Sequence, residues 1–109
     1  MNIIYTKSFD NSLKKLKKHK KEYDNFLKIV SIIENTRDFN ELIHLPQVKM
    51  YGFERLKHDM NEYYSFNLNK KGGTIRLIVK PCINNTIEIY MIFISYDHYN
   101  DFNGVIYYE

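Results

Sequence analysis

The most apolar stretch of the chain spans residues 86–95, and its apolar side chains occupy odd and even positions alike. The stretch is rich in β-branched and aromatic residues and has no Gly or Pro, which favours a strand over a helix. A strand that is apolar on both faces is usually covered on both, so this pattern predicts the central strand of a small sheet. The apolar positions are Ile87, Ile89, Met91 and Phe93 on one side and Tyr90, Ile92 and Ile94 on the other.

A polar cluster follows this stretch directly, with the order Ser-Tyr-Asp-His-Tyr at residues 95–99. A rigid strand holds the groups at its end in a defined position, which a catalytic or binding site requires. We therefore expect the rest of the chain to bring further functional side chains towards His98 and Tyr99.

A short strand at residues 2–6 precedes the first helical pattern. Ser8 is the expected N-cap of this helix, because Ser accepts a hydrogen bond from the free N–H groups of a first turn. Phe9, Leu13 and Leu16 then recur at i, i+4 and i+7 and form a narrow apolar stripe.

A second helix is predicted at residues 22–37, where apolar residues keep the 3.6-residue period. Two consecutive helices after one strand indicate a helical hairpin that lies across a sheet. Residues 39–45 add a helical turn, which Pro46 is expected to end. Residues 47–61 are irregular and rich in charge, and we interpret them as a long loop with an extended portion.

The remaining segments alternate between strands and turns. Strands are predicted at residues 63–69 and 74–80, with turns at 70–73 and 81–85 before the apolar stretch. Short turns join neighbouring antiparallel strands into a meander. The order is therefore β-α-α-β-β-β, an α+β domain with a small, mainly antiparallel sheet and a helical hairpin on one face.

Composition places these elements in one globular domain, residues 1–109, with 44% hydrophobic and 27% charged residues. A single cysteine, Cys82, excludes an internal disulfide and fits a reducing cytoplasm. No apolar run is long enough for a bilayer and no signal-peptide pattern opens the chain, so we expect a cytoplasmic protein without a membrane partner.

A run of positive charge covers the polar side of the first helix and its connection to the second. Such a run is either a solvated surface or a site for a polyanion, and here no acidic residue interrupts it. Because like charges repel one another, contact with nucleic acid is a reasonable alternative to simple solvation. The run comprises Lys14, Lys15, Lys17, Lys18, His19, Lys20 and Lys21.

Four residues are candidates for one site on the sheet face that the helices leave uncovered: Glu54, Arg76, His98 and Tyr99. Cleavage of RNA by its own 2′-OH needs a base for the hydroxyl proton, a cation for the phosphorane and an acid for the leaving oxygen. Glu, Arg and His supply these groups without metal or covalent intermediate, and Tyr can stack on a base or bind a phosphate.

Each candidate also has an ordinary structural explanation. A His at a strand end is often structural, Arg76 can pair with Glu88 on the next strand, and Glu54 can be a solvated charge. The pairs at residues 58–59 and 97–98 combine His with Asp, but no ligand spacing typical of a metal site is present, so no metal is expected.

Several segments resemble the RelE/ParE superfamily, the toxins of bacterial type II toxin–antitoxin pairs. Residues 53–57 and 60–65 are similar to the segment that YoeB-type toxins carry before and into their second strand. Residues 75–79 are similar to the Arg-Leu-Val-Tyr strand of many members. Residues 96–99 resemble both the Tyr-His-Tyr end of YoeB and the Asp-Tyr-His end of HigB toxins.

The resemblance implies a RelE-like fold and a ribosome-dependent endoribonuclease that cuts mRNA without a cofactor. Matched residue by residue, it implies Glu54 as general base, Arg76 as the phosphate-stabilising group, His98 as general acid and Tyr99 as the residue that closes the site. It also implies a cognate antitoxin and contacts with the ribosome and mRNA. The residues expected to contact RNA are Lys14, Lys15, Lys17, Lys18, Lys21, Lys57, His58 and Tyr96.

The sequence departs from the family pattern in two places. RelE itself has lysines and an additional arginine where Ser65, Asn67 and Tyr99 stand here, which favours chemistry of the Glu/His type. The chain also continues through residues 100–109, whereas YoeB-like chains end at the matching Tyr. The alternative functions are a ParE-like protein that poisons DNA gyrase without cutting RNA, and an inactive interaction module.

Overall fold

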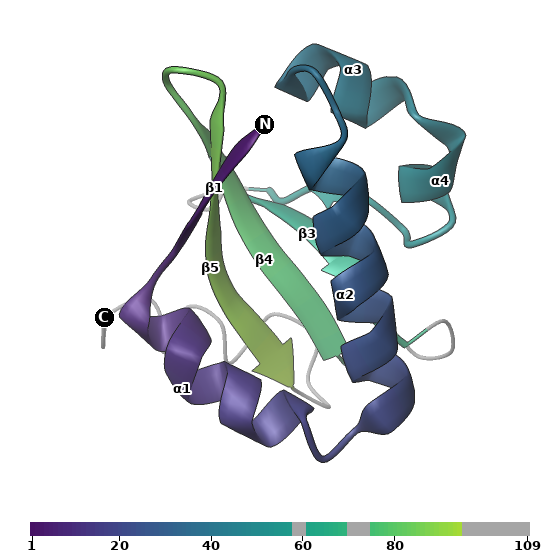
Figure 1. Cartoon of the computed structure of the whole chain (residues 1–109), viewed down its shortest axis with the longest axis vertical. Coiled ribbons are helices and arrows are strands. Elements are labelled where there is room, and N and C mark those ends of the chain that lie inside the picture. Colours follow the sequence, from purple (N-terminus) through teal and green to yellow (C-terminus); the bar gives the residue numbers. More distant parts are fainter. Residues whose placement is uncertain (58–60, 70–74, 95–109) are drawn as a thin grey trace.

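A five-stranded sheet with helices packed on one face forms the domain (Figure 1). The computed structural model describes residues 1–57, 61–69 and 75–94, and for residues 91–94 it describes the backbone alone. The predicted α+β class is confirmed. The strands are β1 (Asn2–Tyr5), β2 (Glu54–Arg55), β3 (Tyr64–Asn67), β4 (Ile75–Cys82) and β5 (Thr86–Ile94), and the helices are α1 (Lys7–Leu16), α2 (Lys20–Glu34), α3 (Phe39–His44) and α4 (Pro46–Lys49).

The strand order is β1-β5-β4-β3-β2, so β4 and not β5 occupies the middle of the sheet. The strand predicted at residues 86–95 is internal as expected, but its position at the centre was wrong. β1 pairs in parallel with β5 and covers one of its edges, but both β3 and β2 lie beyond β4, which puts β4 in the middle. The other three pairings are antiparallel. A local apolar pattern shows that a strand is internal but does not reveal which strands flank it.

A β-bulge at Tyr90 interrupts the alternation that the sequence pattern assumed. Ile78 pairs with Met91 whereas Val79 pairs with Ile89, which leaves Tyr90 as one additional residue in β5. An extra residue reverses the pairing parity of every residue after it. Consecutive residues of β5 therefore pair with consecutive residues of β4 only as far as Ile89, and the pairing resumes at Met91.

The β4–β5 connection is shorter than the predicted turn at residues 81–85, because β4 continues through Cys82. The turn is made by residues 83–85, and Asn84 and Asn85 have positive φ angles of 59° and 55°. Asn tolerates this left-handed region better than other residues with a side chain, which is why two of them stand here. The predicted turn at residues 70–73 lies outside the described part of the chain.

The helix α1 begins two residues earlier than an N-cap at Ser8 would allow, because Thr6 is its N-cap. The Thr6 side-chain oxygen accepts a hydrogen bond from the Phe9 N–H at 3.1 Å. The helix α2 begins at Lys20 and ends at Glu34, three residues before the predicted end. There the Thr36 hydroxyl donates to the Ile32 carbonyl at 2.6 Å and satisfies one of the last free carbonyl groups.

Pro46 does not terminate the helical region but starts α4, where it stands in the first turn. A proline is well tolerated there because the N–H it lacks would have no partner in a first turn. The segment 47–61, expected to be a loop, therefore begins as a helical turn and then contains the two-residue strand β2. Only this extended portion was anticipated.

The core lies between the helices and one face of the sheet. The predicted stripe of α1 faces it, with Phe9 and Leu16 buried and Leu13 partly buried. Leu77 and Val79 of β4 are fully buried against the same cluster. Within the described residues, no helix is long and apolar enough to cross a membrane.

We expect Leu77→Ala to lower the free energy of unfolding by about 2–5 kcal/mol, because it leaves a cavity in the packed core. The matched control is Leu27→Ala on α2, where the side chain is 47% exposed and the change should stay within about 0.5 kcal/mol. Urea denaturation of both variants measures the difference. Equal effects at the two positions would contradict the assigned core.

Candidate functional site

The candidate residues of the second sheet face come from three neighbouring strands. Glu54 on β2 pairs with Ser65 on β3, and Ser65 pairs with Ile78 on β4. Asn67 pairs with Arg76 in the next row that shares this face. Because neighbouring residues of a strand point to opposite faces, these side chains lie opposite the helices, with Phe66 and Leu77 turned towards the core.

Glu54 and Arg76 meet on this face although they belong to strands that are not adjacent. The Arg76 Nη1 lies 3.4 Å from the Glu54 Oε1, and β3 runs between the two strands. Since neighbouring strands lie about 4.8 Å apart, the long Arg76 side chain has to cross β3 to make this contact. The short side chain of Ser65, which faces Glu54 in the register, leaves room for that path.

The acid that pairs with Arg76 is thus Glu54 and not Glu88. In the β4–β5 register, Glu88 stands opposite Lys80, two rows away from Arg76 on this face. The Arg76 side chain is only 8% exposed, whereas that of Glu54 is 52% exposed. The arrangement places a buried guanidinium beside a carboxylate that water and ligands can reach.

This face of the sheet is not the open surface that the sequence predicted. Tyr90 packs edge-on against Tyr63, with ring centroids 5.3 Å apart, because the bulge adds a large aromatic residue here. Among the described residues of this face, Glu54 is exposed, and Asn67 and Lys80 are partly exposed. Buried residues on the described part of this face include Ser65, Arg76, Ile78 and Tyr90.

The structure places only part of the predicted site. Glu54 and Arg76 are brought together, and Lys57 is exposed shortly after β2. His58, Tyr96, His98 and Tyr99 lie outside the described residues, so their roles stay predictions. Among the described residues, no group of three or more His, Cys, Asp and Glu side chains is arranged to hold a metal ion.

A second polar cluster on the same face was not predicted from the sequence. The Lys80 Nζ lies 3.5 Å from the Glu62 Oε2 and 5.7 Å from the centre of the Tyr63 ring. The Glu62 carboxylate raises the pKa of Lys80 above its ordinary value. Glu62 lies in the turn before β3 and not at a facing strand position, so no strand pattern in the sequence indicated this pair.

The positively charged residues near the first helix lie on one exposed surface of α1, the α1–α2 connection and the start of α2. We call the five lysines at positions 14, 15, 17, 18 and 21 the basic surface. None of them takes part in an ion pair among the residues that the structure describes. They are Lys14, Lys15, Lys17, Lys18 and Lys21.

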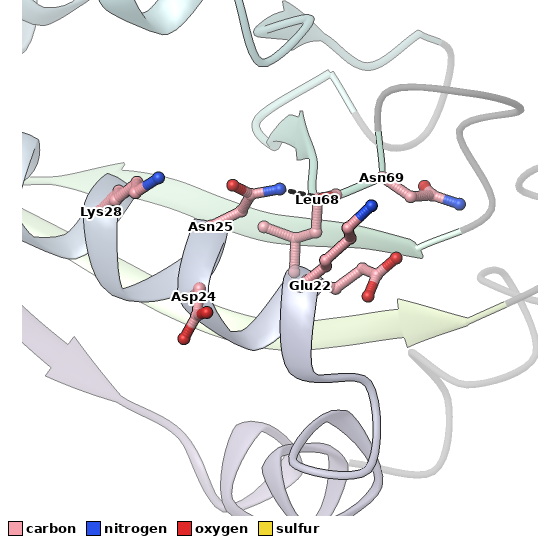
Figure 2. A pocket seen from close by; sticks show the side chains of 7 residues that line it. Glu22, Asp24, Asn25, Lys28, Leu68 and Asn69 are labelled. Atoms are coloured by element: carbon pink, nitrogen blue, oxygen red, sulfur yellow. Dashed lines mark hydrogen bonds between the residues drawn. The ribbon is translucent and has the colours of Figure 1, made fainter.

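A pocket between α2 and the end of β3 adjoins this surface, and Figure 2 shows the residues that line it. The Asn25 Nδ2 donates a hydrogen bond to the Leu68 carbonyl at 2.8 Å and ties the helix to the strand end. Two lysines and two acids surround it, so its charge is mixed and selects no ligand class. The charged lining residues are Lys21, Glu22, Asp24 and Lys28.

Comparison with known proteins places this fold. No family model matches the chain, and no curated protein sequence matches it. YafQ in the E. coli DinJ–YafQ toxin–antitoxin complex superposes with a TM-score of 0.64 at 15% identity, covering 91% of this chain and 97% of that one. The YoeB/ParE toxin from Agrobacterium tumefaciens gives 0.63 at 15% identity, covering 88% and 100%.

The YoeB dimer from Staphylococcus aureus gives a TM-score of 0.62 at 20% identity, covering 88% of this chain and 98% of that chain. Staphylococcal YoeB is also similar to this chain in its complex with YefM. The chain therefore has the fold of the RelE/ParE-superfamily toxins, as the resemblance of its sequence segments implied.

We expect Glu62→Gln to lower the pKa of Lys80 towards its ordinary value, because the carboxylate that raises it is removed. A pKa raised on folding stabilises the protein below the unfolded pKa, and this contribution is lost as the pH rises through the folded value. NMR titration of the Lys80 side chain measures the shift. Glu41→Gln, which removes the partner of Arg37 instead, should leave Lys80 unchanged; an unaltered Lys80 pKa in Glu62→Gln would contradict the assignment.

Proposed function

We propose that this chain is the toxin of a type II toxin–antitoxin pair and that it cleaves mRNA on the ribosome. The observation that carries the proposal is the contact between Glu54 and Arg76 across β3, 22 residues apart in the sequence. It joins the two residues of the described part to which the resemblance assigns the base and the phosphate-stabilising group. The shared fold supports the same class of protein.

The burial of Arg76 favours a functional explanation over a structural one. Taking a guanidinium out of water is costly, and the Glu54 partner remains half exposed and accessible to water. Replacing a buried ion pair by apolar residues is often neutral or stabilising, so stability alone gives little reason for an arginine here. A cation held rigidly in a poorly solvated site does, however, stabilise developing negative charge.

The reaction that fits these groups is internal attack by a ribose 2′-OH. Glu54, as a carboxylate, takes the hydroxyl proton while the 2′-oxygen forms a bond to phosphorus. Arg76 stabilises the negative charge on the phosphorane. The bond between phosphorus and the 5′-oxygen then breaks as His98 donates a proton to that oxygen. Tyr99 closes the site, and the products are a 2′,3′-cyclic phosphate and a 5′-hydroxyl.

Before this reaction, Arg76 and Glu54 have to exchange their mutual contact for contacts with the substrate. The 3.4 Å separation is long for a charge-assisted hydrogen bond, so this contact is a weak one to give up. The exposed side of Glu54 is the direction from which a ribose can approach. Lys57 follows β2 and adds a positive charge for the RNA backbone.

The proposed partners are a cognate antitoxin in the cytoplasm and the ribosome with its mRNA. Complexes of similar structures with DinJ and YefM support the first partner. An antitoxin segment that is acidic and folds on binding would suit Arg76 and Lys57 and would block access to Glu54. For the ribosome, the basic surface offers the charge that ribosomal RNA requires.

We expect Glu54→Gln and His98→Ala each to lower the single-turnover rate on ribosome-bound mRNA by about 10²–10⁴, since each removes a proton-transfer group. Arg76→Ala should lower the same rate by about 10²–10³, because the negative charge on the phosphorane loses the cation that stabilises it. The matched control is Glu41→Gln on α3, which breaks the ion pair with Arg37. A 2′-deoxy substitution at the cut site should stop cleavage in the unchanged protein.

Cleavage that survives the 2′-deoxy substitution would rule out internal attack and with it the role of Glu54. A protein that leaves mRNA intact but inhibits DNA gyrase would instead establish the ParE-like alternative.

The basic surface is expected to bind ribosomal RNA without taking part in catalysis. Changing Lys14, Lys17, Lys18 and Lys21 together to Gln should weaken ribosome binding and flatten its salt dependence. Each lost phosphate contact should reduce the log–log slope by about 0.7–0.9. Binding measured over a range of salt concentrations tests this, with Lys49→Gln on α4 as the control; an unchanged slope would show the basic surface to be merely solvated.

A further inference from the structure

The strand that carries Glu54 is too short to hold its own position. Only Glu54 and Arg55 pair with β3, and β2 lies at the edge of the sheet. A two-residue strand at an edge has few hydrogen bonds to resist a change of register, so its alignment depends on the residues that flank it. A slip of one residue would turn the Glu54 side chain to the opposite face, away from Arg76.

Backbone hydrogen bonds hold both ends of this short pairing. After β2, the Leu56 N–H donates to the Tyr63 carbonyl at 2.9 Å. Before β2, the Asn67 N–H donates to the Tyr51 carbonyl at 2.5 Å. The second bond is the one nearer to Arg76, because Asn67 is the register partner of Arg76 on β4.

Gly52 stands between that hydrogen bond and β2, and extending the β2–β3 register places it opposite Asn67. Its φ angle is +60°, a left-handed conformation that glycine adopts without strain. A Cβ atom at this position would lie 2.5 Å from the Asn67 Nδ2 and 3.1 Å from its Cγ. The Asn67 carboxamide therefore occupies the space that a side chain on residue 52 would take.

The position of the Asn67 side chain is not explained by its own hydrogen bonds. Within the described part of the chain, its Oδ1 is the buried side-chain oxygen that has no hydrogen-bond partner. Such a group is unfavourable for stability, and in native proteins it calls for an explanation. The Asn67 side chain instead packs against Gly52.

We propose that the contact between Gly52 and Asn67 sets the register of β2 and thereby positions Glu54 for its contact with Arg76. Gly52 and Asn67 are positioning residues in this proposal and touch no substrate. The inference rests on the proposed function for its consequence in catalysis, but the geometric part concerns Glu54 and Arg76 alone. It assigns a role to Gly52, which the sequence pattern did not single out, and to Asn67, which the sequence showed only as a departure from the RelE pattern.

The first test reads the Glu54–Arg76 contact without RNA. In the full chain, the NMR signal of the Arg76 Nε–H reports whether Glu54 is in place, and Glu54→Gln defines the signal when the carboxylate is absent. Gly52→Ala should move the Arg76 signal in the same direction as Glu54→Gln. The control is Asn40→Ala on the exposed side of α3, which should leave the signal unchanged.

The second test uses the single-turnover rate on ribosome-bound mRNA. Gly52→Ala should lower this rate by about 10²-fold, the effect expected for a misplacement of roughly 1 Å. In the Glu54→Gln background, the same Gly52→Ala change should have no further effect, because the group it displaces is already absent. A merely structural defect would instead lower the rate in both backgrounds.

A third variant tests the contact itself. In Gly52→Ala combined with Asn67→Ala, the two Cβ atoms would lie 3.6 Å apart, an ordinary packing distance. The double variant should thus be at least as active as Gly52→Ala alone, and its Arg76 signal should return towards that of the unchanged protein. If the factor by which the double variant lowers the rate equals the product of the factors of the two single variants, the proposal is overturned.

The outcomes separate this inference from the proposed function. If the unchanged protein cleaves mRNA and Glu54→Gln abolishes cleavage, but Gly52→Ala keeps both the rate and the Arg76 signal, the positioning role is wrong. A second outcome is that Gly52→Ala moves the Arg76 signal as Glu54→Gln does, but neither the unchanged protein nor any variant cleaves RNA. In that case the positioning role holds and the nuclease proposal fails. Thermal unfolding of each variant by circular dichroism identifies any that do not fold. If Gly52→Ala does not fold, Asn67→Leu replaces it, because this change alters the contact from β3 and keeps glycine at the positive φ angle.

Discussion

The burial of both faces of β4 is the constraint on which the rest of this structure depends. On one face Leu77 and Val79 pack against the helices, and on the other Ile78 and Arg76 are buried as well. An arginine in such a strand is stable only if its charge meets an acceptor, because an unpaired buried charge is very costly. Glu54 at the far edge of the sheet provides one, and the arginine side chain is long enough to reach it across β3.

The short edge strand β2 is therefore important because it carries Glu54, the partner of the buried Arg76. The core of the domain lies on the helix side and would be complete without β2, since its buried side chains come mainly from α1, α2, β3, β4 and β5. The position of β2 is determined instead by backbone hydrogen bonds and by the close approach of Asn67 to Gly52. On the sheet face opposite the helices, Glu54 and Arg76 form one ion pair, and Lys80 and Glu62 form a second.

The same fold occurs in toxins whose sequences share only 15–20% identity with this chain. Such similarity is sufficient to preserve which positions are apolar, because a core tolerates many side chains of similar volume. It does not preserve individual polar residues, and a fold shared at this level hosts different functions. The proposed function therefore rests on Glu54 and Arg76 and on their contact, and not on the architecture.

The sequence by itself determined the elements whose periodicity reports burial. The stripe of Phe9, Leu13 and Leu16, the second helix and the strands around Leu77 and Ile87 were all predicted, as was the α+β class. These predictions succeeded because helix and strand periods are local properties of neighbouring residues. Glu54 and Arg76 were also selected as candidates from the sequence, through their residue types and the resemblance of their segments.

Only the tertiary structure decided how these elements meet. It placed β1 beside β5, inserted the bulge at Tyr90, and chose Glu54 over Glu88 as the partner of Arg76. Each of these depends on the alignment of strands that are distant in the chain, and one additional residue in a strand reverses the faces that follow. The physical reason is that register and strand order arise from packing and backbone pairing between segments, which no local pattern of side chains records.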